Sequence, residues 1–110
     1  YNSAVNCLKD LYQRIPKFDK QYKYLLGNKL VEYNTKIITL IFEISNSRDS
    51  TERSGMCSEI LKNADLMMIH ARICNDLKQF GKEESYLYVS ENLVNISDQA
   101  EKWKKHLDNN

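Results

Sequence analysis

Residues 83–107 read EESYLYVSENLVNISDQAEKWKKHL, and this stretch decides the fold. Its apolar side chains recur at alternating intervals of three and four residues, at Tyr86, Val89, Leu93, Ile96, Ala100, Trp103 and Leu107. That interval places them on one face of an α-helix. The stretch opens on two glutamates and ends among three lysines, an order that complements the helix dipole. We predict an amphipathic helix here.

The segment before it, residues 53–80, carries two apolar series. One consists of Cys57, Ile60, Ala64, Met67, Ala71 and Cys74, and the other of Leu66, Ile69, Ile73, Leu77 and Phe80. Both series have helical spacing, and Gly81 supplies a stop signal at the end. A helix that is apolar on two adjacent faces needs a neighbour on each.

Two more helices precede residue 45. The first follows Val5, Leu8, Tyr12 and Ile15 and ends at Pro16. The second begins after Asp19, a good N-cap type, and follows Tyr22, Leu26, Leu30, Tyr33, Ile37, Leu40 and Ile44. Gly27 falls inside it and marks either a close approach of another backbone or an irregular first turn. Residues 45–51 form a polar turn, where Asp49 stands three residues before Glu52 as in a capping box.

Four helices with short polar connections predict an all-α, antiparallel, up-and-down four-helix bundle, with residues 1–110 as one domain. The first helix is too short to cover the whole of its longer neighbour. Some apolar surface should therefore stay open. Seven tyrosines, with Phe42, Leu87 and Val94 outside the main series, indicate that part of this surface faces another subunit. We expect a homo-oligomer.

Composition narrows the class of protein. The 110 residues are 42% hydrophobic and 28% charged, typical of a soluble domain, and no apolar run reaches the ~18 residues of a membrane span. No export leader is visible, so we expect a cytoplasmic protein. Three cysteines without a CxxC pair predict buried thiols rather than a disulfide framework.

Few residues offer catalytic chemistry. His70 and Cys74 are four residues apart and could share a metal, with Glu59, Asp65 and Asp76 nearby, but a bundle di-metal site needs two Glu-x-x-His pairs and the chain has none. No phosphate-binding glycine loop and no nucleophile elbow occur. We expect a non-enzyme without cofactor or metal, and keep a metal-binding bundle enzyme as an alternative.

Charge is uneven along the chain. Residues 1–36 hold seven Lys or Arg against three Asp or Glu, whereas residues 37–110 hold nine against twelve. Lys17, Lys20 and Lys23 recur every third position, and Lys29 and Lys36 are seven apart. This series is either a solvated helical face or a surface for nucleic acid or a partner protein, and oligomerisation would add the copies together.

Four strings resemble the accessory variability determinant proteins of diversity-generating retroelements. They are Ile15-Pro16-Lys17-Phe18, Tyr24-Leu25-Leu26-Gly27-Asn28-Lys29-Leu30, Asn46-Ser47-Arg48-Asp49 and Cys74-Asn75-Asp76-Leu77-Lys78. The resemblance spans nearly the whole chain. The related four-helix proteins encoded in intervening sequences of ribosomal RNA genes carry a Ser-x-x-Asn-Ile-Ala-Glu-Gly type signature that is missing here, and that group remains a second alternative.

The resemblance implies a non-catalytic protomer of a pentameric barrel. By that likeness it binds the error-prone reverse transcriptase of the element and its template RNA, and so supports mutagenic cDNA synthesis and retrohoming. The candidate contact residues are Lys20, Lys23, Lys29, Lys36, Arg48, Arg72 and Lys78. Two of them have structural alternatives, since Arg48 could pair with Asp49 or cap a helix end and Arg72 could pair with Asp76.

Overall fold

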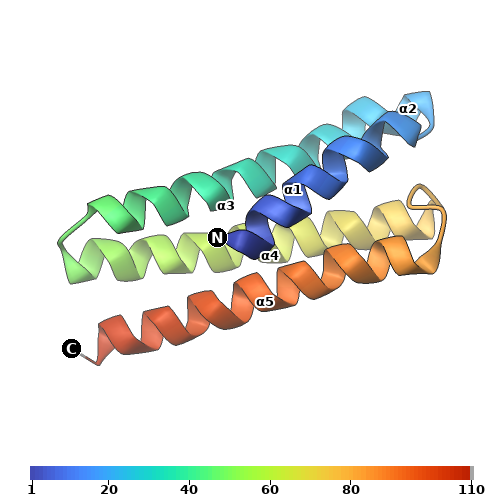
Figure 1. The fold of residues 1–110 in the computed structure, drawn as a ribbon. Coiled ribbons are helices and arrows are strands. Elements are labelled where there is room, and N and C mark those ends of the chain that lie inside the picture. The colour runs from blue at the N-terminus through green and yellow to red at the C-terminus, as the bar shows by residue number, and fades with distance from the viewer. Residues whose placement is uncertain (110) are drawn as a thin grey trace.

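A computed structural model describes residues 1–109 (Figure 1). The helices in chain order are α1 (Asn2–Arg14), the 3₁₀ turn η1 (Ile15–Lys17), α2 (Lys20–Tyr22), the π-helical turn η2 (Lys23–Gly27), α3 (Asn28–Asn46), α4 (Ser50–Asp76) and α5 (Glu83–Asp108). No strand occurs within residues 1–109. The predicted all-helical fold with four principal helices is confirmed.

Each principal helix packs against two others. α4 lies between α3 and α5, and α1 covers the opposite side by packing on α3 and α5 (Figure 1). The bundle measures 47 × 21 × 19 Å, so its long axis follows the helices. α1 and α4 are therefore diagonal to each other, and the core lies along the axis between all four helices.

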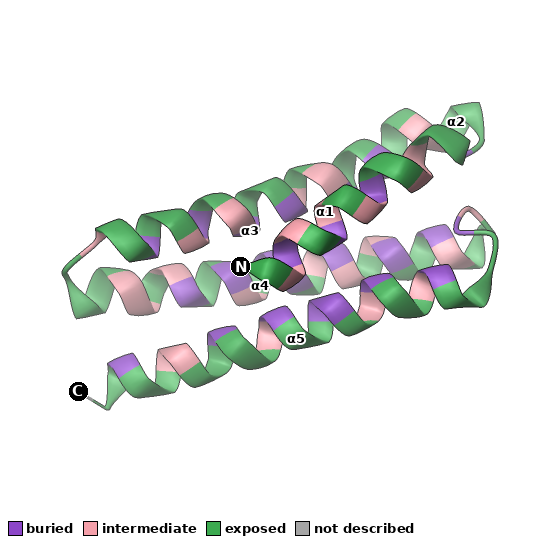
Figure 2. Cartoon of the chain, in the orientation of Figure 1, coloured by how far each residue is buried: buried purple, intermediate pink, exposed green. Residues whose placement is uncertain are grey.

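The core consists of the apolar series that spacing predicts. The six residues of the first α4 series are all buried, and we call them the inner face of α4: Cys57, Ile60, Ala64, Met67, Ala71 and Cys74. In α5, Val89, Leu93 and Ile96 are buried, and Figure 2 shows buried residues on the inward side of α1, α3, α4 and α5. Burial of this kind contributes roughly 25 cal/mol per Å² of apolar surface, which makes it the main stabilising term.

In α3 the predicted apolar series faces the core, and one fully buried residue lies outside that series. Asn34, not Tyr33, is fully buried, and its Nδ2 donates to the backbone oxygen of Ala4 at 2.9 Å. Tyr33 is half-buried, and its ring makes a tilted contact with that of His70. A buried amide needs a hydrogen-bond partner, and here the partner is the backbone of α1. This contact fixes how α1 sits on α3.

The start of the second long helix also differs from the expectation of one regular helix. A single α-helical turn is followed by the π turn Lys23–Gly27 before α3 begins. Tyr22, Leu26 and Leu30 follow each other in steps of four, which is more than the 3.6 residues of an α-helical turn, and a wider turn keeps them on one face. A Cβ on Gly27 would lie 2.7 Å from Cγ2 of Ile15. The irregular turn expected at Gly27 is therefore confirmed, whereas the close neighbour is the side chain of Ile15 and not a backbone.

Of the two aspartates predicted to cap helix N-termini, one makes cap hydrogen bonds and the other does not. Asp49 caps α4, since its carboxylate accepts hydrogen bonds from the backbone N–H of Thr51 at 2.8 Å and of Glu52 at 3.3 Å. The reciprocal bond of a capping box is absent, because Glu52 accepts instead from the hydroxyl of Ser47. Asp19 occupies the N-cap position of α2 without making a side-chain cap bond.

Incomplete coverage by α1 is confirmed. Tyr1, Ile41 and Trp103 border a small apolar pocket of about 50 Å³ where α1 begins. Apolar side chains also remain on the outside, as expected. Those more than a third exposed are Tyr1, Tyr12, Tyr24, Leu25, Phe42, Ile69, Ile73, Leu77, Leu87, Tyr88 and Val94.

Candidate partner and nucleic-acid interface

The second apolar series of α4 lies mostly on the surface. Ile69, Ile73 and Leu77 are 51%, 40% and 38% exposed, and Leu66 is half-buried. We call these four residues the outer stripe. Only Phe80, beyond the end of α4, turns into the core, where its ring meets that of Phe18 edge to face with centroids 5.8 Å apart. The outer stripe is a row of branched side chains more than two helical turns long.

Two predicted lysines border this stripe from α3. The rings of Tyr33 and His70 meet at a tilt of 60° with centroids 5.1 Å apart, which fixes the level at which antiparallel α3 and α4 meet. Lys29 precedes Tyr33 by about one turn and so lies level with the turn after His70, which contains Ile73. Lys36 lies in the other direction, level with Leu66. Both lysines are exposed, and they place positive charge along the α3 edge of the outer stripe.

Lys29 also makes a local ion pair. Its Nζ lies 3.6 Å from a carboxylate oxygen of Glu32, one turn away, and both side chains are more than half exposed. Exposed pairs of this kind contribute between about 0 and 1 kcal/mol, because water screens them and two long side chains must be ordered. Lys29 is therefore free to exchange Glu32 for a stronger acceptor on a partner.

Three further predicted lysines gather at the α2 end of the bundle. The backbone N–H of Asp19 donates to Oε1 of Gln79 at 2.7 Å, and Nε2 of Gln79 donates back to the Asp19 carboxylate at 3.1 Å. This reciprocal pair holds the corner before α2 against the turn after α4. Lys20 directly follows Asp19, and Lys78 directly precedes Gln79. Lys23 lies about one helical turn after Lys20. Lys78 has φ of 61°, a turn conformation.

The two predicted arginines do not join these lysines. Arg48 lies in the turn after α3, and the 19 residues of α3 place it about 28 Å from the α2 end. Arg72 is two residues after His70, a rotation of about 200°, so it points away from α3. Neither arginine forms an ion pair within residues 1–109, so the expected pairings with Asp49 and Asp76 are not found. The seven candidates do not form one patch.

His70 and Cys74, the candidate ligands of the alternative metal-binding enzyme, make other contacts. Nδ1 of His70 lies 2.8 Å from the backbone oxygen of Leu66, and Cys74 is fully buried, which raises the pKa of its thiol to about 11. Burial raises the pKa of Cys7 to about 12. All three cysteines are free and buried, as predicted. Residues 1–109 contain no group of three or more His, Cys, Asp or Glu placed to hold a metal.

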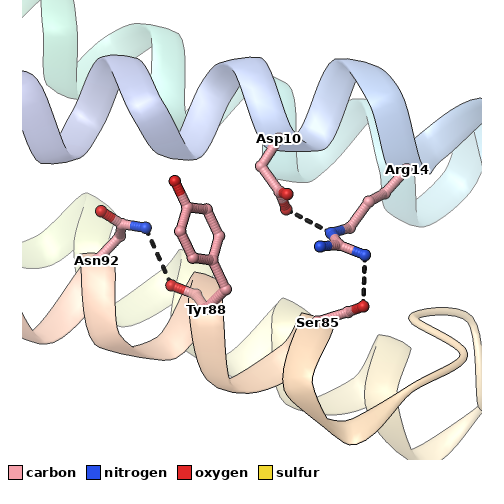
Figure 3. A network of polar contacts seen from close by, with 5 residues as sticks. All are labelled: Asp10, Arg14, Ser85, Tyr88 and Asn92. Carbon is pink, nitrogen blue, oxygen red and sulfur yellow. Dashed lines mark hydrogen bonds and ion pairs between the residues drawn. The ribbon is translucent and has the colours of Figure 1, made fainter.

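A second basic surface, which the spacing of residues does not single out, lies between α1 and the start of α5. Nε of Arg14 donates to the Asp10 carboxylate at 2.5 Å, and Nη1 donates to the hydroxyl of Ser85 (Figure 3). The i, i+4 spacing of Asp10 and Arg14 could have indicated the first bond. The second joins residues 71 positions apart, and no local pattern reveals it.

No helix within residues 1–109 combines the length and apolar character that crossing a membrane requires. Comparison of the chain with protein-family models, with curated proteins and with solved structures finds no match.

Proposed function

We propose that this protein is a non-catalytic accessory subunit of a diversity-generating retroelement, working in the cytoplasm with the reverse transcriptase of the element and its template RNA. The observation that carries the proposal is the open outer stripe of α4 bordered by Lys29 and Lys36. An exposed apolar row beside cations is typical of an interaction surface, whereas isolated apolar residues on a monomer carry no such meaning.

The four strings behind the family resemblance give independent support. Two of them, close together in the sequence, contact each other at the α2 end of the bundle, and the last string ends near them. Ile15 of the first string contacts Gly27 of the second, and Phe18 of the first packs on Phe80, just beyond the Cys74–Lys78 string. The segments that carry the resemblance therefore pack close together in this chain.

In this proposal the outer stripe is covered by another copy of the chain in a pentameric ring. Branched side chains at Ile69 and Ile73 supply the apolar centre that subunit interfaces need. A closed ring repeats each exposed lysine around its axis, so a chain whose net charge is only +1 gains a concentrated basic rim. That rim suits a polyanion or an acidic protein surface.

The reverse transcriptase is the proposed partner of the α3 lysines. We expect Lys29→Glu combined with Lys36→Glu to reduce its recovery at least tenfold when the tagged protein is purified from its own host, because two attractive contacts become repulsive. The matched control is Lys102→Glu with Lys105→Glu, which reverses two exposed charges on the last turns of α5. Mass spectrometry identifies the protein, and sequencing identifies the RNA.

The proposal fails if no reverse transcriptase and no element RNA are recovered from cells shown to express the element. It also fails for the α3 lysines if both double variants lose the enzyme equally. Circular dichroism and thermal melting confirm that all variants are folded.

A further inference from the structure

A groove runs along the surface between α1 and the first half of α5. Its larger part is an open pocket of about 650 Å³, and a second pocket of about 180 Å³ continues it along α1. The two pockets share Asp10 and Tyr88, so they form one depression. Its floor at the wider end is Phe80.

Four cations line this groove from three parts of the chain. Lys9 and Arg14 come from α1, Lys17 from the 3₁₀ turn, and Lys82 from the loop before α5. The positions from Lys9 to Lys17 span about 12 Å along the helix axis, at 1.5 Å per residue. Within residues 1–109, none of the three lysines forms an ion pair. Their charge is available to a ligand.

Two carboxylates also line the groove, and the structure distinguishes them. Asp10 accepts the bond from Nε of Arg14, so these two charges offset each other and the three lysines carry the excess positive charge. Glu84 is exposed at the first turn of α5, where it complements the helix dipole. The groove therefore keeps a positive balance along its length.

Arg14 is held ready to bind an anion. Asp10 takes Nε and Ser85 takes Nη1, so the guanidinium plane is fixed between the two helices (Figure 3). Nη2 has no acceptor within the described chain. A fixed guanidinium with one free edge loses little side-chain entropy when a phosphate oxygen binds to it. Ser85 is buried and accepts from Arg14, which leaves its own hydroxyl proton free to donate.

An aromatic ring stands in the middle of the row of cations. Tyr88 is 42% exposed and lines both pockets, and Figure 3 shows its ring between the two helices on the same side as Arg14. The buried residues of this turn of α5 are Ser85 and Val89, so the ring of Tyr88 is not part of the core. An exposed ring among cations is the arrangement that stacks bases while lysines bind the backbone.

We infer that the α1/α5 groove binds a short stretch of single-stranded RNA, with Lys9, Arg14, Lys17 and Lys82 on its phosphates and a base stacked on Tyr88. This deepens the proposed function and rests on it only for the choice of RNA. It leaves the α3 lysines to the protein partner. A base inside a duplex has no free face for Tyr88, so a single strand fits the groove better.

Fluorescence anisotropy with a short labelled single-stranded RNA tests the inference on the full chain. Lys17→Gln with Lys82→Gln removes two phosphate contacts, so the slope of log affinity against log salt should fall by about 1.4. Tyr88→Leu should weaken binding about fivefold or more and leave that slope unchanged, because stacking is not ionic. Lys102→Gln with Lys105→Gln removes equal charge elsewhere on α5 and should change neither quantity.

The inference is overturned if the control pair weakens binding as much as the groove pair, or if Tyr88→Leu has no effect. Competition by polyglutamate as effective as competition by unlabelled RNA would assign the groove to an acidic protein instead. If inorganic phosphate competed as well as unlabelled RNA at the same total concentration of phosphate groups, the groove would be a simple anion site. Lys29→Glu with Lys36→Glu should keep RNA in the groove while losing the reverse transcriptase, so failure of this inference and of the proposed function are distinguishable.

Discussion

The two apolar faces of α4 have similar spacing but opposite environments. Every residue of the inner face is buried, whereas Ile69, Ile73 and Leu77 of the outer stripe are more than a third exposed. The residue types differ as well, since the inner face uses small side chains such as Ala64 and Ala71, and the outer stripe uses branched ones. Small residues let neighbouring helices approach closely within the chain. The inner face therefore belongs to the core of the single chain, and the outer stripe is the face that we propose for assembly.

The largest expected effect separates these two faces directly. Met67→Ala on the inner face should lower the free energy of unfolding by about 2–5 kcal/mol, because it removes a fully buried side chain and leaves a cavity. Ile73→Ala on the outer stripe should lower it by less than about 1 kcal/mol in dilute protein, where the single chain unfolds. Urea denaturation measures both. Equal losses would show that the two faces do not differ in role.

Two glycines also differ in their surroundings, since Gly27 lies against a side chain and Gly55 lies at an open surface. Gly27→Ala should cost about 1–3 kcal/mol, since the new Cβ would meet the stiff, branched side chain of Ile15. Gly55→Ala is the matched control on α4, where a Cβ meets nothing within 4 Å, and it should stabilise the helix by about 0.5–1 kcal/mol. Thermal melting measures both variants. If the melting temperature rose in both, the close contact of Gly27 with Ile15 would not require glycine.

The start of α4 gives a smaller effect. Asp49→Ala should reduce stability by about 1 kcal/mol, because the backbone N–H groups of Thr51 and Glu52 lose their acceptor. Arg48→Ala, one residue earlier and exposed, should change stability by less than about 0.5 kcal/mol. An arginine variant as damaging as the aspartate variant would reassign the cap to Arg48.

Ionisation of the Cys74 thiol should leave protein stability unchanged at neutral pH and lower it at alkaline pH. Burial raises the pKa of Cys74 to about 11 in the folded chain, above its ordinary value of 9.0. The unfolded chain therefore loses the proton first, and the stability present below pH 9 is lost as pH rises toward 11. Melting temperature should fall less over this range in Cys74→Ala than in the unmodified protein. Identical pH profiles would show that the thiol does not contribute.

Sequence predicted most of the fold, because spacing alone reports which residues share a face. The α5 series and the inner face of α4 needed no tertiary information. Asn34 was missed because a polar residue in an apolar series looks like an exposed one until its partner on Ala4 is known. Gly27 indicated an irregular turn, but its π-helical form was not predicted, because steps of four also occur in regular helices.

The candidate site was less predictable from sequence. Lys29 and Lys36 were found by their spacing, but their place beside the outer stripe depends on how α3 meets α4. Arg48 and Arg72 were grouped with them by resemblance, and the fold separates them. The α1/α5 groove depends on the bond from Arg14 to Ser85, a contact between distant segments that no periodicity encodes.

The most direct test of assembly through the outer stripe is the mass of the protein in solution by light scattering, beside that of Ile69→Glu with Ile73→Glu. The unmodified protein should have a mass about five times the 12.9 kDa of one chain at micromolar concentration, and the double variant should be a folded single chain. A single chain for the unmodified protein, or the same large mass for both, would contradict the role assigned to the outer stripe.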